Sequence, residues 1–180
     1  MTTDKAVMGR ARAIDTIPLG GFFIGLFDLL FAFIFYGLIM GVPYLRIFQS
    51  VASGVLGRQR ATTGGVRTFV LGILLHFVVA TCIATVYYLA TLALPVILRH
   101  PVVSGLIYGV MAYFGMKYIV LPLSAIGQRG NLPRFPILIT EVIGHAVLVG
   151  LPVALLAHRS AKGNSSDRTY ETYSSNRTYE

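Results

Sequence analysis

The residues best suited to chemistry in this chain lie inside its apolar segments. Glu141 and His145 fall within the apolar run 136–157 and are four positions apart, so on a helix they share one face. An ionisable side chain at the centre of a bilayer costs about 3 kcal/mol or more, and such groups usually face the interior of a bundle or a water-filled cavity. We therefore predict an integral membrane helix bundle organised around this polar face.

Asp28, His76 and Lys117 interrupt the other apolar runs in the same way. At a rise of about 1.5 Å per residue, measured from one common interface, Lys117 and Glu141 both lie roughly 8 Å deep. His145, His76 and Asp28 follow at roughly 13, 15 and 18 Å. We predict one polar site with two levels, Lys117 beside Glu141 and Asp28 beside the two histidines.

Each of these residues also has a structural interpretation. Lys117 either pairs with Glu141 or extends its ammonium group to the interface. Asp28 is too deep to reach the interface, and it serves either an interhelical hydrogen bond or a functional role. His76 fits a core histidine bonded to a carbonyl group. Glu141 with His145 is a relay pair, a ligand clamp or a structural lock.

A short amphipathic segment, 44–57, follows the first apolar run and is too short to span a bilayer. We predict an interfacial helix, with Gln49 and Ser53 placed over the polar site. Its predicted apolar face holds Leu45, Phe48, Val51, Ala52 and Val55, and its polar face holds Arg46, Gln49, Ser50, Ser53 and Gly57. A loop, 58–65, would lead back into the membrane.

The apolar runs predict an all-α protein with transmembrane helices at 17–40, 66–94, 102–121 and 136–157, forming one domain over 17–157. The first run is too long for a signal peptide and lacks a small-x-small cleavage site, so we expect it to remain as a helix. Residues 1–16 form a polar N-terminal stub. Residues 158–180, with the near-repeat SSDRTYE and SSNRTYE, are predicted to be a disordered polar tail.

Small residues recur at four-residue spacing on three of these helices. Gly21 with Gly25 and Gly105 with Gly109 form G-x-x-x-G pairs, which allow close helix approach. A third seam runs through Gly72, His76, Ala80 and Ala84. These patterns indicate which faces meet inside the bundle.

The composition agrees with a membrane protein and narrows its partners. Of 180 residues, 55% are hydrophobic and 12% are charged, against about 25% charged in soluble domains. The net charge of +8 comes mainly from loops beside the apolar runs, so anionic lipid is the simpler partner and nucleic acid is not expected. The single cysteine, Cys82, excludes an intramolecular disulfide. A membrane-protein partner or a homo-oligomer remains open.

The number of spans places both termini on one side of the membrane. Basic residues are nearly balanced between the two sides, so the positive-inside rule decides little. Arg168 and Arg177 add to the side of the termini, and we predict that this side is cytoplasmic.

Three functional classes compete for the polar site. The first is passage of a proton, an ion or a small solute, because carboxylate and histidine chains mark such paths. The second is a structural or accessory subunit of a larger membrane complex. The third is a redox module, with His76 and His145 as haem ligands or a metal bound by the same carboxylates and histidines. No cofactor or metal is predicted as the main interpretation, and no enzyme activity is expected, since neither G-x-S-x-G nor H-E-x-x-H occurs.

Several motifs resemble those of a bacterial family of small four-helix membrane proteins of uncharacterised function. They are GLFDLLFA, IFQSVASGVLG followed by a glycine pair and LGILLHFVVA, and YGVMAYFGMKYIVLPLSA. The last two helices are also similar to YagU-like inner-membrane proteins, in the break at Pro122 and the E-x-x-G-H of Glu141, Gly144 and His145. The resemblance covers most of 20–157 and implies a bacterial inner membrane and four helices, without an activity.

Overall fold

The computed structural model describes residues 10–127 and 133–177, and for 165–177 the backbone alone. Within these ranges every regular element is a helix, and four helices are long and apolar enough to cross a membrane. They run over Ala13–Ile39, Gly65–Ala93, Pro101–Leu123 and Phe135–Asn164. The predictions of an all-helical chain and of four apolar helices of spanning length are confirmed. Residues 1–9 of the predicted stub and 128–132 of the last predicted loop lie outside the described ranges.

Three of the four spans change from α-helix to π-helix along their length. The first joins α1 (Ala13–Ala32) to the π-helix η1 (Phe33–Ile39), and the second is α4 (Gly65–Ala93) without a break. The third joins α5 (Pro101–Gly115), the π-helix η3 (Met116–Val120) and α6 (Leu121–Leu123). The fourth joins α7 (Phe135–Gly144), the π-helix η4 (His145–Gly150) and α8 (Leu151–Arg177).

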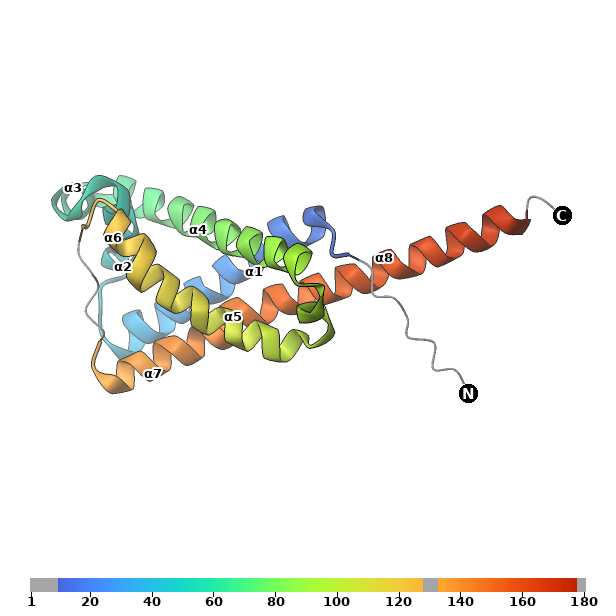
Figure 1. Cartoon of the computed structure of the whole chain (residues 1–180). Coiled ribbons are helices and arrows are strands. Elements are labelled where there is room, and N and C mark those ends of the chain that lie inside the picture. The colour runs from blue at the N-terminus through green and yellow to red at the C-terminus, as the bar shows by residue number, and fades with distance from the viewer. Residues whose placement is uncertain (1–9, 128–132, 178–180) are drawn as a thin grey trace.

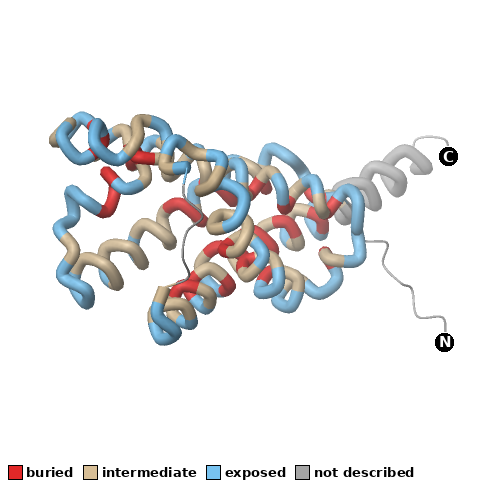
Figure 2. The backbone as a smooth tube through the Cα atoms, turned by 60° about the vertical axis from the view of Figure 1, so that its left-hand side comes forward, coloured by how far each residue is buried: buried red, intermediate tan, exposed pale blue. Residues whose placement is uncertain are grey.

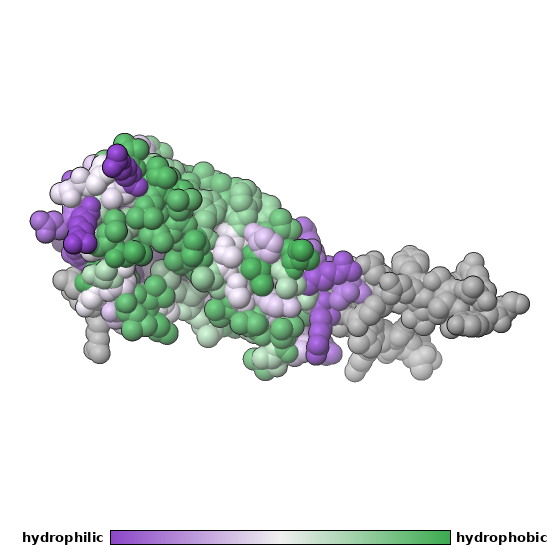
Figure 3. Space-filling model, turned by 90° about the horizontal axis from the view of Figure 1, so that it is seen from above, coloured by the Kyte–Doolittle hydropathy of each residue, from purple (hydrophilic) through white to green (hydrophobic). Residues whose placement is uncertain are grey.

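The bundle has two ends, which we name after the elements they carry (Figure 1). The α2 end carries α2 (Tyr44–Leu56), α3 (Arg58–Thr63), α6 and the start of α7. The η2 end carries the start of α1 and the 3₁₀ turn η2 (Pro95–Arg99) between α4 and α5. A hydrophobic band lies between hydrophilic side chains at the two ends, as expected for helices that cross a bilayer (Figure 3).

The packing order of the spans leaves one side of the bundle open. α1 packs against α4, α8 and η4, while α5 packs against η4 and α8. α4 and α5, although joined by η2, make almost no direct backbone contact. Most buried positions lie on the helix faces that meet, and exposed positions lie outside them (Figure 2).

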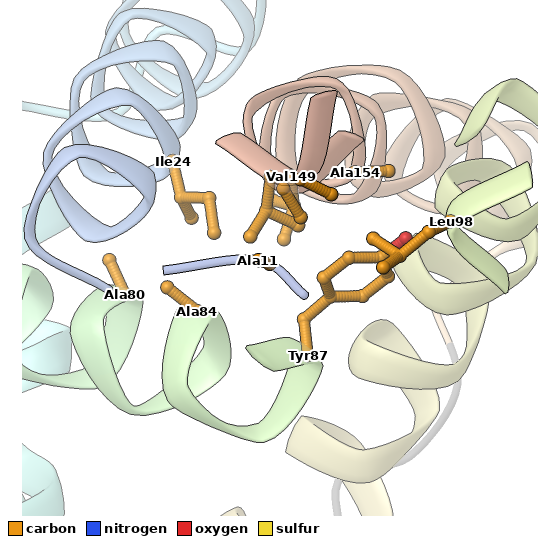
Figure 4. Close-up of a cluster of buried hydrophobic side chains, with 11 residues drawn as sticks. Ala11, Ile24, Ala80, Ala84, Tyr87, Leu98, Val149 and Ala154 are labelled. Carbon is orange, nitrogen blue, oxygen red and sulfur yellow. The ribbon is translucent and has the colours of Figure 1, made fainter. Parts of the chain in front are cut away.

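A cluster of buried apolar residues, the packed core, holds α1, α4 and α8 together toward the η2 end (Figure 4). Its members are mostly small: Ala80 and Ala84 on α4 face Ile24 on α1 and Val153 on α8. A Cβ atom on Gly21 would lie 2.8 Å from Cα of Thr81, so this glycine is required for the close approach of α1 to α4. The Gly21 and Gly25 pair thus lies where the sequence predicts, at a helix contact.

Two predictions between the first and second spans are wrong. The segment predicted as a loop, 58–65, contains the short helix α3, bounded by Gly57 and Gly65 with φ of 77° and 57°. Glycine adopts this left-handed conformation readily, so the chain turns before and after α3. Thr62 and Thr63 further satisfy carbonyl groups of α3 with their hydroxyl groups.

The predicted faces of α2 are correct in part, since Phe48 and Ala52 are buried and Arg46 is exposed, and wrong in part. Gln49 and Ser53, assigned to the polar face, are buried, while Leu45 and Val55, assigned to the apolar face, are exposed. The reason is the contact with α4, where a Cβ atom on Gly72 would strike the carbonyl of Phe48. As a result, the face of α2 that carries Gln49 lies against α4. The helix itself is present over Tyr44–Leu56, and its placement at a membrane interface stays a prediction.

The end of the chain differs from the predicted disordered tail over 158–177, since α8 continues to Arg177, and 178–180 lie outside the described residues. Side chains in the middle of α8 form hydrogen bonds with the start of the described chain and with η2. Ser160 donates to Oδ2 of Asp15 at 2.9 Å, and Asn164 donates to the carbonyl of Arg10 at 3.0 Å. His158 donates from Nδ1 to the carbonyl of Leu98 in η2 at 2.7 Å. These contacts keep both ends of the described chain at the η2 end.

Candidate functional site

Glu141 is the centre of a hydrogen-bonded network between three spans. It lies on α7, is only 6% exposed, and accepts hydrogen bonds from the hydroxyl groups of Tyr36 and Tyr113, the second at 2.5 Å. Nζ of Lys117 lies 3.9 Å from its Oε2. The carboxyl group therefore binds side chains from η1, α5 and η3, and each partner satisfies a polar atom that would otherwise be costly in lipid.

The π-helical segments supply much of this network. Tyr36 lies in η1, Lys117 in η3 and His145 in η4. A π turn adds a residue to the helical repeat and redirects the side chains around it, and such turns are frequent at functional sites. Glycine lies in or beside each segment, at Gly37, Gly115 and the pair Gly144 and Gly150.

Asp28 and His76 form a second pair, between α1 and α4. Nε2 of His76 is 3.0 Å from the carbonyl of Gly25 and 3.9 Å from Oδ2 of Asp28. A carbonyl oxygen only accepts, so this nitrogen carries a proton and donates. The interpretation of His76 as a histidine bonded to a carbonyl matches this contact. The carboxyl group of Asp28 remains about one quarter exposed.

His145 is oriented by its own helix. Its Nδ1 donates to the carbonyl of Glu141 at 2.9 Å, and its ring lies 5.1 Å from the ring of Tyr113. The proton on Nδ1 leaves Nε2 of a neutral ring as an acceptor. Among the residues that the structure describes, Nε2 has no hydrogen-bond partner. His145 thus offers a free acceptor beside the Glu141 network.

These two groups of side chains meet at a cavity of about 180 Å³, which we call the polar cavity. It lies between the first, third and fourth spans, and α4 reaches it only through the contact of His76 with Asp28. Its lining residues are Asp28, Phe31, Ala32, Tyr36, Tyr113, Met116, Lys117, Leu121, Glu141 and His145. A water molecule occupies about 30 Å³ of liquid, so this volume holds several waters or one small solute.

Gln49 and Ser53 do not reach the polar cavity. Nε2 of Gln49 donates to the carbonyl of Gly65 at 3.1 Å and to Oγ1 of Thr68 at 3.3 Å. Ser53 donates to the carbonyl of Ser50 on its own helix at 2.5 Å. Both belong to the junction of α2 with α4. Of the seven side chains predicted for one site, the structure brings five around or beside the cavity.

Tyr36 and Tyr113 were not expected from the sequence, although Tyr113 carries a signal. It continues the four-residue spacing of Gly105 and Gly109, and Lys117 is the next member of that series. These four residues lie on one face of the third span, so Tyr113 is placed between the helix contact at the two glycines and the polar group of the lysine. Tyr36 carries a similar signal, since it continues the four-residue spacing of Asp28 and Ala32, and all three line the cavity.

The positions of the histidines and carboxyl groups bear on the third functional class, a haem or metal module. Within the described residues no group of three or more His, Cys, Asp or Glu side chains is close enough to hold a metal ion. Nε2 of His76 is engaged with a carbonyl of α1, and Nδ1 of His145 with a carbonyl of α7. Haem ligation by the two histidines therefore stays a prediction that would need at least the His76 contact to break.

Comparison of this chain with protein-family models, with curated proteins and with solved structures finds no match in any of the three.

Proposed function

We propose that this multi-pass membrane protein takes a proton, a cation or a small polar solute into the polar cavity as one step of passage across the bilayer. The observation that carries the proposal is the cavity itself. Two carboxyl groups, one ammonium group and one free imidazole nitrogen line a space large enough for water. Two carboxyl groups against one lysine favour protons and cations over anions.

The packed core explains why passage would need a second conformation. From the cavity to the η2 end, the contacts between α1, α4 and α8 are made by buried small and apolar residues. A hydrophilic species entering from the α2 end would stop at Asp28, Glu141 and His145. In this proposal a solute enters the cavity from the α2 end, and its release at the other end requires the core contacts to separate.

The test is flux in proteoliposomes, for protons with a pH-sensitive dye and for monovalent cations with an ion-sensitive dye. Asp28→Asn and Glu141→Gln should lose most of the flux while remaining folded. Asp15→Asn is the matched control, because Asp15 lies on the same span as Asp28 but contacts Ser160 at the η2 end. If the two cavity variants fold and retain wild-type flux, the proposal fails.

A structural or accessory role is the alternative, and one observation favours it. Every oxygen of Glu141 has a partner within the chain, so the network locks three spans without any ligand. In this case Glu141→Gln would weaken the fold, and the protein would purify with a larger membrane complex. The further alternative, a haem module, predicts a Soret band in the absorption spectrum of the purified protein.

We propose the bacterial cytoplasmic membrane as the location, with both termini on the cytoplasmic side. The support is the family resemblance and the basic residues near the η2 end, among them Arg99 and Arg159. A reporter fused after Glu180, active only in the cytoplasm, tests the side directly.

A further inference from the structure

A long groove separates α4 from α5 on the open side of the bundle. It consists of two adjoining cavities of about 420 and 440 Å³, which share Val86, Tyr108 and Met111. Along α4 the groove extends from Val79 to Leu94, about 22 Å at 1.5 Å per residue. It lies within the spanning helices and shares one lining residue, Met116, with the polar cavity, so it is a second site that adjoins the proposed passage site.

The groove presents apolar atoms because its polar groups are satisfied by the protein. The hydroxyl group of Tyr108 donates to the carbonyl of Ile83 at 2.5 Å, and that of Tyr87 lies 3.1 Å from Oγ of Ser104. The rings of the two tyrosines are 4.9 Å apart and bridge the space between α4 and α5. Val86, Ile107 and Met111, which line the groove, are each more than half exposed. A polar solute would find no partner here, whereas a hydrocarbon chain would cover exposed apolar surface.

One end of the groove meets a cationic turn. His100 lines the groove, and both His100 and its neighbour Arg99 are exposed at the η2 end, where the helices leave the hydrocarbon region. Asp15, an acidic residue at the same end of the bundle, accepts a hydrogen bond from Ser160. An anionic group at the interface would therefore meet Arg99 and His100 while an attached apolar chain followed the groove inward.

We propose that the groove between α4 and α5 is a binding site for one anionic phospholipid, with its phosphate at Arg99 and His100 and one acyl chain between the helices. The dimensions favour this occupant. One leaflet of the hydrocarbon core is about 15 Å thick, which is shorter than the groove.

The experiment is native mass spectrometry of the full-length protein in detergent, titrated with phosphatidylglycerol or with phosphatidylcholine of the same acyl chains. Wild type should retain one phosphatidylglycerol in preference to phosphatidylcholine. Arg99→Gln should weaken retention about fivefold, the effect of one basic residue at an anionic surface. Arg67→Gln is the matched control, since Arg67 is exposed at the start of α4, at the opposite end of the bundle from Arg99 in η2.

A second pair of variants tests the groove separately from the charge. Ala90 lines the groove, so Ala90→Phe should fill it and lower retention of both lipids, whereas Leu89→Phe, at an exposed neighbouring position, should not. Three results would overturn the proposal: equal retention of the two lipids, equal effects of Arg99→Gln and Arg67→Gln, or a dimer that forms through this groove and excludes lipid.

Discussion

The packed core and the polar cavity are built on the same helices and differ in how those helices are held. In the core, glycine and alanine bring α1, α4 and α8 into close contact, and the buried side chains are almost all apolar. Around the cavity three spans turn into π-helices, and hydrogen bonds to Glu141 are added to close packing between α5 and η4. Lipid tails are as apolar as leucine, so helices in a membrane associate through close packing and polar contacts. Here close packing is present in both regions, and the polar contacts to Glu141 are confined to the region of the cavity.

The difference implies a division of roles. The packed core is suited to stability, because small residues leave few ways to repack. The polar cavity is an unfilled space of about 180 Å³, and the side chain of Asp28 beside it is partly exposed. Both features lower the stability of the fold, which indicates that this region has a function other than stability. If the two halves have these roles, substitutions in them should affect stability and flux in opposite proportions.

The largest effect on stability is expected at Gly150. A Cβ atom there would strike the carbonyl of Gly105 and the backbone of Gly109, so α5 and η4 must separate. We expect Gly150→Ala to lower the free energy of unfolding by about 3 kcal/mol, measured by titration with a denaturing detergent. Gly115→Ala is the control, since a Cβ atom at Gly115 meets nothing within 4 Å, and it should be neutral or stabilising by up to about 1 kcal/mol. Equal stability of the two variants would remove the case for close packing as the main support.

A smaller effect is expected at Glu141. Glu141→Ala leaves the hydroxyl groups of Tyr36 and Tyr113 without their acceptor and Lys117 without its counter-charge. We expect a loss of about 2 kcal/mol in the same detergent titration. Thr140→Ala, at the neighbouring position, should change stability little, since Thr140 donates only to the carbonyl of Pro136. An unchanged stability of Glu141→Ala would show that the network does not hold the three spans.

The smallest effects are expected at the tyrosines. Tyr36→Phe and Tyr113→Phe each remove one hydrogen bond to Glu141 and should each cost about 0.6 kcal/mol, the average for such bonds between membrane helices. Because both donate to one carboxyl group, the double variant should differ from the sum of the single variants. Strict additivity would mean that the two tyrosines act independently of each other.

The sequence predicts the fold well because length and hydropathy decide it. Runs of about 20 apolar residues allow only spanning helices, since lipid satisfies no backbone hydrogen bond. The pairing of Lys117 with Glu141, and of Asp28 with His76, could also be predicted. The rise per residue gives the depth of each side chain in the membrane, and side chains at similar depth on different helices can meet. The depth of a residue in the membrane does not say which way its side chain points from the helix axis. Most differences between the prediction and the structure arise for this reason.

The predicted orientation of side chains around a helix is wrong where the helix departs from regular α geometry. It is also wrong where the helix packs in a way that hydropathy does not encode. The face of α2 was mistaken because Gln49 is buried by contacts with Gly65 and Thr68, and an amphipathic pattern assigns a glutamine to the outside. Tyr36 shares a four-residue spacing with Asp28 and Ala32, but hydropathy does not distinguish this tyrosine from one at the membrane interface. The extension of α8 depends on Ser160 and Asn164, whose partners Asp15 and Arg10 are remote in the sequence.

The most direct test of the difference between the two halves is the accessibility of single cysteines to a charged, membrane-impermeant thiosulfonate. In a Cys82→Ala background, Ala32→Cys and Leu121→Cys place a thiol in the polar cavity, and Ile24→Cys and Val149→Cys place one in the packed core. We predict that the cavity thiols react when the reagent is added on the α2 side of reconstituted vesicles, and that the core thiols react from neither side. Unreactive cavity thiols, or core thiols that react as fast as those in the cavity, would contradict a hydrated site closed by a dry core.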